Sequence, residues 1–434
     1  MTVDTFICRC CLSEKEIQTT YTVKSGNAIF TYLECLPCGS LTVINSKENF
    51  GYDDLMNSAG IEHYVELGAG IDSMTELLHP LIELEFNTKS KTYLELGCGF
   101  GFLIDYAKFI GFGNTVGVED ANYGKIGSEI LGFNCENLSD FENSSQSFDV
   151  VLASEVIEHV EEPLRFLESI RGRLSKDGVL VLTTPNSKFI NKTNVDRKES
   201  LTLAALSPGF HTCLFSPDAL TDLLFKVGFK NIEIFIKHER LVVYASDNSN
   251  YVFNAPDPIN SKKLYLEYLN YLTKNENVSV QVGSNLRIFK ELVNRGVTDA
   301  NIDEVYSFLV RNLGFPLLDF GKSEVPNNSQ INSLEEYQNH FRFHEGVFTF
   351  YASQHERNLG RPGMQIALLE KALSIIDREL GHFPQFFQES SSVQGVALER
   401  LEEALHFVDF RYFNSTQIPN DSLVRRWFKS LKRS

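Results

Sequence analysis

A short segment that begins at Tyr93 places the strongest constraint on how this chain folds. Residues Tyr93–Leu96 read as an apolar strand that carries one acidic side chain, Glu95. Three glycines follow at alternate positions, namely Gly97, Gly99 and Gly101. Glycine lets the backbone turn sharply and approach a ligand closely. Because Phe102–Ala107 is compatible with a helix, we expect a strand, a tight ligand-binding loop and a helix in succession.

Apolar runs alternate with amphipathic segments from Thr92 to about Ser246, which predicts a sheet wrapped by helices. Strands are expected at Tyr93–Leu96, Thr115–Glu119, Phe148–Ala153, Gly178–Thr183, Ile232–Ile236 and Leu241–Ala245. The glycine spacing is Gly-x-Gly-x-Gly, whereas a dinucleotide-binding fold would usually show Gly-x-Gly-x-x-Gly. The second strand ends on an acid, Glu119.

The glycine loop with Glu95 ahead of it and Glu119 beyond it resembles motif I of class I S-adenosylmethionine-dependent methyltransferases. The resemblance implies a Rossmann-like, seven-stranded α/β sheet. It also implies that Glu95 and the loop glycines accommodate the amino acid end of S-adenosylmethionine, and that Glu119 accepts hydrogen bonds from both ribose hydroxyls. Asn137, near the end of the third strand region, is a candidate for the adenine contact.

Later segments extend this resemblance over roughly residues 90 to 245. The strand Phe148–Ala153 precedes a Glu-His pair, Leu174–Leu180 enters the next strand, and Gly209–His211 resembles the region that closes over the acceptor. If Glu155, Glu158 and His159 lie on a helix, they share one face at the carboxyl edge of the sheet, where substrates bind in this architecture.

Three interpretations of this acidic and histidine set stay open. His159 can act with Glu155 in acid/base chemistry and take the proton of an acceptor hydroxyl. Alternatively, Glu155, Glu158 and His159, with His211 as a further ligand, can bind a divalent ion such as Mg²⁺ or Mn²⁺. This pattern resembles the Glu-x-x-Glu-His site of quinone-biosynthesis and small-RNA methyltransferases. In the third interpretation the side chains only cap the helix and line the pocket.

Five of the eight cysteines fall within residues 8 to 38. They form two Cys-x-x-Cys pairs, and the four ligands that these predict for a structural zinc ribbon are Cys8, Cys11, Cys35 and Cys38. A redox disulfide would explain one pair but not two. Cys10 is interpreted as a spectator, although a zinc register that uses it stays open. Such a module ahead of a methyltransferase resembles the arrangement in sugar- and polysaccharide-modifying methyltransferases.

The chain is expected to contain three parts. These are a zinc-ribbon module at residues 1–45, a methyltransferase domain with a helical lead-in at residues 46–247, and a mostly helical accessory domain at residues 248–434. Helical spacing is clear at Ile366, Leu369 and Leu373. The accessory part lacks a second glycine-rich strand and turn, which weakens C-methylation and leaves a hydroxyl acceptor at least as plausible.

The formal net charge of −17 disfavours nucleic acid as a partner. No apolar run approaches the roughly 20 residues that cross a bilayer, so a cytoplasmic location is expected. The tail Leu423–Ser434 combines basic residues with Trp427, a mixture that can contact an anionic membrane or an acidic partner. It can equally pack on the body of the protein.

These observations together predict a methyltransferase that acts on a sugar or another polar small molecule, with surface polysaccharide or deoxysugar biosynthesis as the expected setting. Two rival hypotheses stay open. One is a metal-assisted methyltransferase acting on an RNA 2′-hydroxyl, and the other is a catalytically silent scaffold that holds partners.

Overall fold

The computed structural model describes residues 6–15, 17–25, 28–43, 58–68, 70–84, 90–197, 200–313, 331, 333–383 and 386–407. The chain divides into two compact units, Met1–Leu55 with Ile71–Tyr265, and Met56–Gly70 with Leu266–Ser434. These units cut across the predicted boundaries at residues 45 and 247. The predicted basic tail Leu423–Ser434 lies outside the described residues. Within the described part, no helix is both long and apolar enough to cross a membrane.

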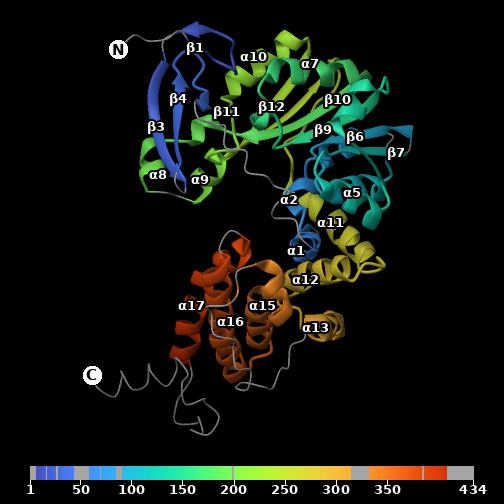
Figure 1. The fold of residues 1–434 in the computed structure, drawn as a ribbon. Helices are drawn as coiled ribbons and strands as arrows, with labels where there is room; N and C mark the ends of the chain where they lie inside the picture. Colours follow the sequence, from blue (N-terminus) through green and yellow to red (C-terminus); the bar gives the residue numbers. More distant parts are fainter. Residues whose placement is uncertain are drawn as a thin grey trace. The chain divides into compact units, whose positions relative to one another are not determined.

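The first unit is built on a seven-stranded sheet with the order β12-β13-β10-β9-β6-β7-β8 (Figure 1). The strands are β6 (Thr92–Leu96), β7 (Asn114–Val118), β8 (Asn134–Glu136), β9 (Phe148–Ser154), β10 (Leu174–Pro185), β12 (Asn231–Lys237) and β13 (Arg240–Ser246). The neighbouring pairs β8–β7, β7–β6, β6–β9 and β9–β10 are parallel. Strand β13 is antiparallel to both of its neighbours, β10 and β12. The predicted seven-stranded α/β sheet is therefore confirmed.

The central strands are continuous apolar runs because both faces of the sheet are covered. In β9, Val150, Val151 and Leu152 are fully buried. Helices pack on the sheet, and α7 and α10 contribute Leu167 and Leu220 to the same hydrophobic core. The helices of this unit are α2 (Asp72–Thr75), α3 (His79–Glu83), α4 (Phe102–Phe109), α5 (Asn122–Leu131), α6 (Leu138–Asn143), α7 (Pro163–Arg173), α8 (Lys192–Asp196), α9 (Ser200–Leu206) and α10 (Pro217–Val227).

A second, smaller sheet of the first unit carries the amino-terminal cysteines. Its order is β11-β5-β4-β3, and it lies beside the short hairpin β1-β2. The strands are β1 (Phe6–Ile7), β2 (Glu14–Lys15), β3 (Ile17–Ser25), β4 (Ala28–Cys35), β5 (Leu41–Val43) and β11 (Cys213–Leu214). Strand β11 comes from far along the chain, since Cys213 pairs with Thr42 and Leu214 with Leu41. The cysteine module is therefore completed by a segment that follows β10.

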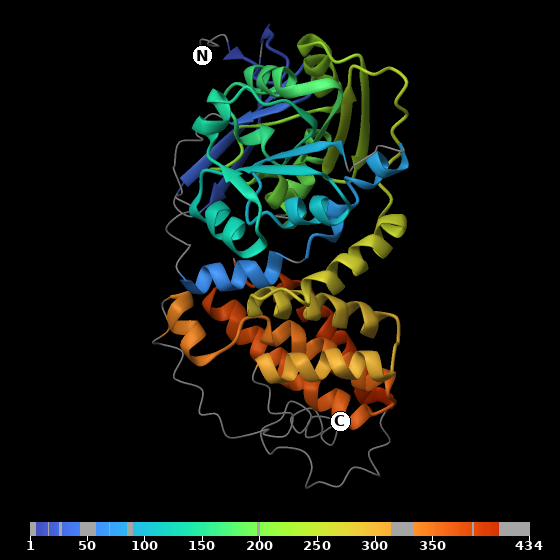
Figure 2. The ribbon, with the colours of Figure 1, turned by 90° about the vertical axis from the view of Figure 1, so that its right-hand side faces the viewer.

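The second unit is helical, as the sequence predicts for the carboxyl-terminal region, and its helices lie side by side in Figure 2. They are α1 (Ser58–Gly68), α12 (Val278–Asn294), α13 (Ala300–Leu313), α14 (Leu334–His340), α15 (Glu345–Asn358), α16 (Pro362–His382) and α17 (Gln388–Phe407), while α11 (Pro258–Leu272) spans the division between the units. A Cβ atom at Gly283 of α12 would collide with the backbone of Glu66 in α1. This close helix contact explains why the lead-in helix groups with the second unit.

Candidate functional site

The glycine loop joins β6 to α4 through three residues in the left-handed backbone region. The φ angles of Gly97, Gly99 and Gly101 are 67°, 55° and 79°, a conformation that residues with a side chain rarely adopt. A Cβ atom at Gly101 would collide with the ring of Phe133, whereas a Cβ atom at Gly99 would meet nothing within 4 Å. The backbone at Gly99 therefore faces open space that a ligand can approach.

Glu119, which follows β7, lies directly beside this loop. Its carboxylate accepts hydrogen bonds from the amide of Gly99 at 3.2 Å and from the amide of Ala121 at 3.1 Å. Strands β6 and β7 are adjacent and parallel, so their carboxyl ends meet at one edge of the sheet. The structure thus brings together the glycines and the acid that the sequence singles out. Open backbone and a fixed carboxylate fit the amino acid end and the ribose of S-adenosylmethionine.

The other two donor-side candidates are held by internal contacts. Glu95 is only 5% exposed, its carboxylate accepts a 3.3 Å hydrogen bond from the Tyr93 hydroxyl, and burial raises its pKa to about 8. Asn137 caps α6: its side-chain oxygen accepts from the Asp140 amide and its NH₂ group donates to the Asp140 carboxylate, both at 2.8 Å. A contact between Asn137 and adenine stays a prediction.

The segment Glu155–His159 does not form the helix that the sequence analysis assumes. Strand β9 ends at Ser154, Glu155 has a left-handed φ of 54°, and only Ile157–His159 forms a 3₁₀ turn. The amide of Glu155 donates to the Thr183 carbonyl at 3.0 Å, and the Glu158 carbonyl accepts from the Thr212 amide at 2.7 Å. These long-range bonds occupy backbone groups that a helix would need.

As a result, Glu155 and Glu158 make different contacts. The Glu155 carboxylate accepts from the Thr183 hydroxyl at 2.8 Å and pairs with Arg240 Nε at 3.3 Å. Glu158 is fully buried, and the Thr184 hydroxyl donates to its carboxyl group at 2.9 Å. Sequence reasoning missed Arg240 and both threonines. The two consecutive threonines at the carboxyl end of β10 were the one sequence feature that could have indicated these contacts.

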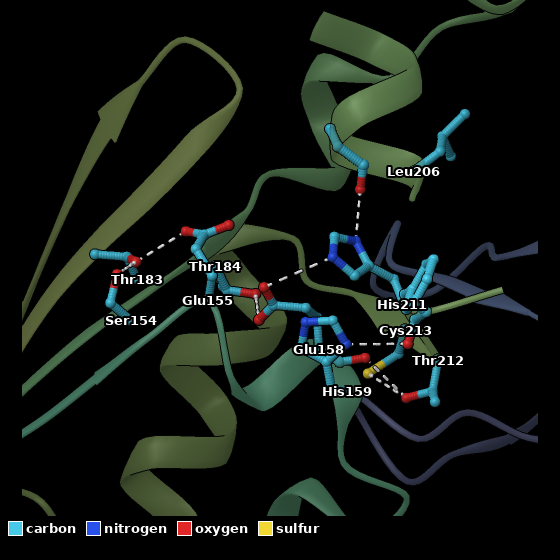
Figure 3. A network of polar contacts seen from close by, with 12 residues as sticks. Ser154, Glu155, Glu158, His159, Thr183, Thr184, Leu206, His211, Thr212 and Cys213 are labelled. Atoms are coloured by element: carbon cyan, nitrogen blue, oxygen red, sulfur yellow. Dashed lines mark hydrogen bonds and ion pairs between the residues drawn. The ribbon is translucent and has the colours of Figure 1, made fainter. Parts of the chain in front are cut away.

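The described part of the chain contains two groups of side chains that can hold a metal ion, and one of them consists of Glu158, His159 and His211 (Figure 3). Their ligand atoms lie within 4.8 Å of one another, and Glu155 is not part of the group. The two imidazole rings meet edge to face with centroids 4.7 Å apart. His211 Nε2 lies 3.9 Å from Glu158 Oε1. A divalent ion can therefore be bound by one carboxyl group and two imidazoles.

Backbone carbonyls set the tautomers of the two histidines. His159 Nδ1 lies 3.1 Å from the Phe210 carbonyl, and His211 Nδ1 lies 2.8 Å from the Ala205 carbonyl. Since a carbonyl can only accept, each Nδ1 carries the proton and each Nε2 keeps its lone pair. Burial, aided by the neighbouring His159, lowers the pKa of His211 to about 4, and burial raises the pKa of Glu158. Both Nε2 atoms can act as a base or as a metal ligand.

The four predicted zinc ligands converge in the cysteine module of the same unit. Cys8 Sγ lies 3.8 Å from Cys38 Sγ, and Cys11 Sγ lies 3.6 Å from Cys35 Sγ. Disulfide sulfurs lie about 2.05 Å apart, whereas sulfurs at Zn–S distances of about 2.3 Å in a tetrahedron lie about 3.8 Å apart. All four sulfurs form one group that can hold a metal ion, and Cys10 is not a member.

Hydrogen bonds join the cysteine module to the large sheet. The Ser187 hydroxyl, just after β10, donates to the Gly39 carbonyl at 2.8 Å. The amide of Ser216, the N-cap of α10, donates to the Ser40 hydroxyl at 2.9 Å. Because β11 also begins two residues after His211, the metal-binding turn and the histidine site are connected through one short segment.

A comparison with known protein families identifies the domain that contains the glycine loop. The profile of a family of methyltransferase domains matches residues 65–234. The chain carries a class I S-adenosylmethionine-dependent methyltransferase domain. The match includes the glycine loop, Glu119 and the Glu158–His159–His211 group, whereas the four predicted zinc ligands precede it.

Curated relatives of the methyltransferase domain include ubiquinone biosynthesis O-methyltransferases. The Coxiella burnetii protein is 23% identical over 155 residues, which cover 33% of this chain and 66% of that protein, just under two thirds. The mitochondrial protein of Schizosaccharomyces pombe is 28% identical over 217 residues, covering 45% of this chain and 72% of that protein.

Solved structures give similar matches at low identity. A magnesium protoporphyrin IX methyltransferase from Synechocystis PCC 6803 has a TM-score of 0.32 and 16% identity, and the match covers 44% of this chain and 89% of that one. A methyltransferase from Mesorhizobium loti has a TM-score of 0.31 and 17% identity, with 38% of this chain and 95% of that one covered.

Proposed function

We propose that this protein transfers a methyl group from S-adenosylmethionine to a hydroxyl group of a polar small molecule, with a sugar as the preferred acceptor class. The observation that carries this proposal is the contact between the Gly99 amide and the Glu119 carboxylate, beside open space in the loop. Glu158 and His159 of the candidate metal group follow β9, a strand that is adjacent and parallel to β6. Donor and acceptor groups are thereby supplied by neighbouring strand ends.

On the donor side, the residues bind and orient. When bound, S-adenosylmethionine supplies an electrophilic methyl carbon attached to a sulfonium. The Glu119 carboxylate is suited to accept hydrogen bonds from the ribose hydroxyls, and the open backbone at Gly99 leaves room for the amino acid end. Holding the two reactants in line contributes much of the rate in such a transfer.

On the acceptor side, His159 Nε2 is the base. The acceptor oxygen forms a bond to the methyl carbon, the carbon–sulfur bond breaks with its electron pair left on sulfur, and the hydroxyl proton moves to Nε2. The bond from Nδ1 to the Phe210 carbonyl holds the ring in the required tautomer. Arg240 keeps Glu155 ion-paired, so we assign Glu155 to positioning of this wall of the site.

A metal-assisted version of the same reaction is the second candidate. Glu158 Oε1 is buried with no hydrogen-bond partner in the described part of the chain, and it faces His211 Nε2. A buried carboxyl oxygen without a partner is costly unless something binds it. In this version Glu158, His159 and His211 would hold Mg²⁺ or Mn²⁺, and the ion would supply Lewis-acid polarisation of the acceptor hydroxyl.

We further propose that Cys8, Cys11, Cys35 and Cys38 hold a structural Zn²⁺. The sulfur separations of 3.6 and 3.8 Å support this assignment. The preference for a sugar rests on a resemblance: a zinc-binding module placed ahead of a methyltransferase domain resembles the arrangement in sugar-modifying methyltransferases. Curated relatives are named ubiquinone biosynthesis O-methyltransferases, so a phenolic hydroxyl is the alternative acceptor against which the sugar is compared.

Methyl transfer from isotopically labelled S-adenosylmethionine tests the proposal. The full chain is incubated with a panel of nucleotide sugars, free oligosaccharides, catechols and a short RNA. We expect label in a carbohydrate, loss of transfer in Glu119→Ala, and retained transfer in Glu129→Ala, which removes an exposed acid from neighbouring α5. Label in the catechol or the RNA would overturn the sugar preference. No S-adenosylmethionine binding by folded protein would overturn the methyltransferase assignment.

A further inference from the structure

The helical unit contains a cavity of about 520 Å³ that the proposed methyl transfer does not use. It lies between α11, α12 and α13, and its lining residues all belong to the second unit. Sites for small molecules have volumes of roughly 300–1,000 Å³. The size of this cavity is therefore sufficient for a small-molecule ligand.

Each helix presents one face to the cavity, and each face carries amides or hydroxyls where a purely structural interface would be apolar. Leu266 and Asn270 of α11, and Thr273 after it, are spaced by four and three residues. Asn301, Val305 and Phe308 of α13 follow the same helical spacing. The cavity combines an apolar, aromatic wall with hydrogen-bonding groups.

Asn285 of α12 is the buried polar group of this cavity. It is 7% exposed, and its NH₂ group donates to the Gln281 carbonyl of its own helix at 2.8 Å. Asn270 likewise donates to the Leu266 carbonyl at 2.9 Å. Each of these two side-chain amides donates a hydrogen bond to its own helix, and its carbonyl oxygen can accept a hydrogen bond from a ligand.

The charges around the cavity cancel. Two carboxylates, Glu291 and Glu304, and two guanidinium groups, Arg295 and Arg311, line the cavity, and Arg295 and Glu291 form an ion pair at 3.8 Å within their helix. An anionic ligand would meet the two glutamates, and a cationic one would meet the two arginines, so neither is favoured. The lining instead offers carboxylate and amide acceptors together with guanidinium donors.

We propose that this cavity binds an uncharged carbohydrate. Sugar hydroxyls both donate and accept, which matches the mixed donors and acceptors, and the C–H face of a sugar ring can pack on the Phe308 ring and Leu292. The site is separate from the Glu158–His159–His211 group, and its occupancy does not depend on methyl transfer.

The test is binding of the full chain to an array of neutral and anionic oligosaccharides. Saturation-transfer NMR with methyl glycosides of glucose, mannose and galactose follows, with glucuronic acid as the anionic probe. We expect neutral glycans to bind. Asn285→Leu, which keeps the volume and removes the amide, should weaken binding about tenfold or more, since an unpaired hydrogen-bonding group costs about 1–3 kcal/mol.

Asn312→Leu is the matched control, because Asn312 donates to the Phe308 carbonyl of its own helix at 2.9 Å but does not line the cavity. It should bind as the wild-type protein does, and Arg311→Met on the exposed rim should weaken binding without unfolding the chain. The proposal is overturned if no neutral glycan binds folded protein, if glucuronic acid competes equally, or if both asparagine variants bind alike. Loss of glycan binding in Glu119→Ala but not in Asn285→Leu would place the ligand at the methyltransferase site instead.

Discussion

The Thr212 amide donates to the Glu158 carbonyl at 2.7 Å, and the next residue, Cys213, pairs with Thr42 in the sheet that follows the cysteine turn. One short segment therefore holds the buried acid of the acceptor site and also completes the cysteine module. A disturbance of the metal-binding turn should reach Glu158 and His211 through β11.

Loss of the metal should impair acceptor use more than donor binding. We expect about one zinc per chain in wild-type protein and none in Cys38→Ser. The variant should lose at least about tenfold in kcat/KM for the acceptor, because an ordered metal site contributes directly to local folding. Calorimetry should show nearly unchanged S-adenosylhomocysteine affinity. Cys10→Ser, outside the four-sulfur group, should keep its zinc. Zinc retained in Cys38→Ser and lost in Cys10→Ser would contradict the assigned ligands.

Two glycine substitutions should separate stability from donor binding. Gly101→Ala forces a side chain against Phe133 at a φ of 79° and should lower the free energy of unfolding by about 1–3 kcal/mol. Gly99→Ala shares the unfavourable left-handed φ, here 55°, but its methyl group meets nothing within 4 Å, so it should destabilise the fold less than Gly101→Ala does and should weaken donor binding. Thermal unfolding and donor titration of both variants check this. The reverse order of effects would show that Gly99 does not face the donor.

His159→Asn should lower kcat/KM about a hundredfold or more, the usual effect of removing a general base, with donor affinity unchanged. His238→Asn is the control, since His238 is exposed in the turn between β12 and β13. Dialysis against EDTA with zinc content monitored then distinguishes base from metal chemistry. Activity that survives supports the base, and activity lost and restored by Mg²⁺ supports the metal. Full activity of His159→Asn would exclude both.

Glu379 should make the helical unit less stable as the pH rises. It is fully buried, it accepts from the Gly346 amide at 3.1 Å, and burial raises its pKa from 4.5 to about 7. The unfolded chain releases this proton near pH 4.5 and the folded unit near pH 7, so the unfolding free energy falls between these values. In Glu379→Gln the amide oxygen can still accept from the Gly346 amide, and the substitution should remove up to about 3 kcal/mol of this fall. Thermal unfolding at pH 5 and pH 8 measures it; equal pH dependence in both proteins would contradict this account.

The sheet and the donor loop could be predicted because their signals are local. Apolar runs mark the six predicted strands, whereas β8 (Asn134–Glu136) carries none and was not predicted. Gly99 and Glu119 follow adjacent parallel strands, so their meeting follows from the topology. The cysteine group could be predicted for a similar reason, since each pair sits in its own tight turn.

The backbone path on the acceptor side could not be predicted because distant backbone groups determine it, although the predicted Glu158, His159 and His211 do form one group. The Glu155 amide bonds to Thr183, and the Glu158 carbonyl bonds to Thr212, which together replace the expected helix. Strand β11 is only two residues long, so no periodicity reveals it. Likewise, α1 belongs with the helical unit through the close contact at Gly283, which a residue pattern around Ser58–Gly68 does not encode.

Titration of S-adenosylhomocysteine into this chain by calorimetry tests the central claim most directly. The contact between the glycine loop and Glu119, beside open space at Gly99, predicts one site per chain, with affinity lowered at least tenfold in Glu119→Ala and unchanged in Glu129→Ala. Absence of binding to folded wild-type protein, or equal binding by Glu119→Ala, would contradict it.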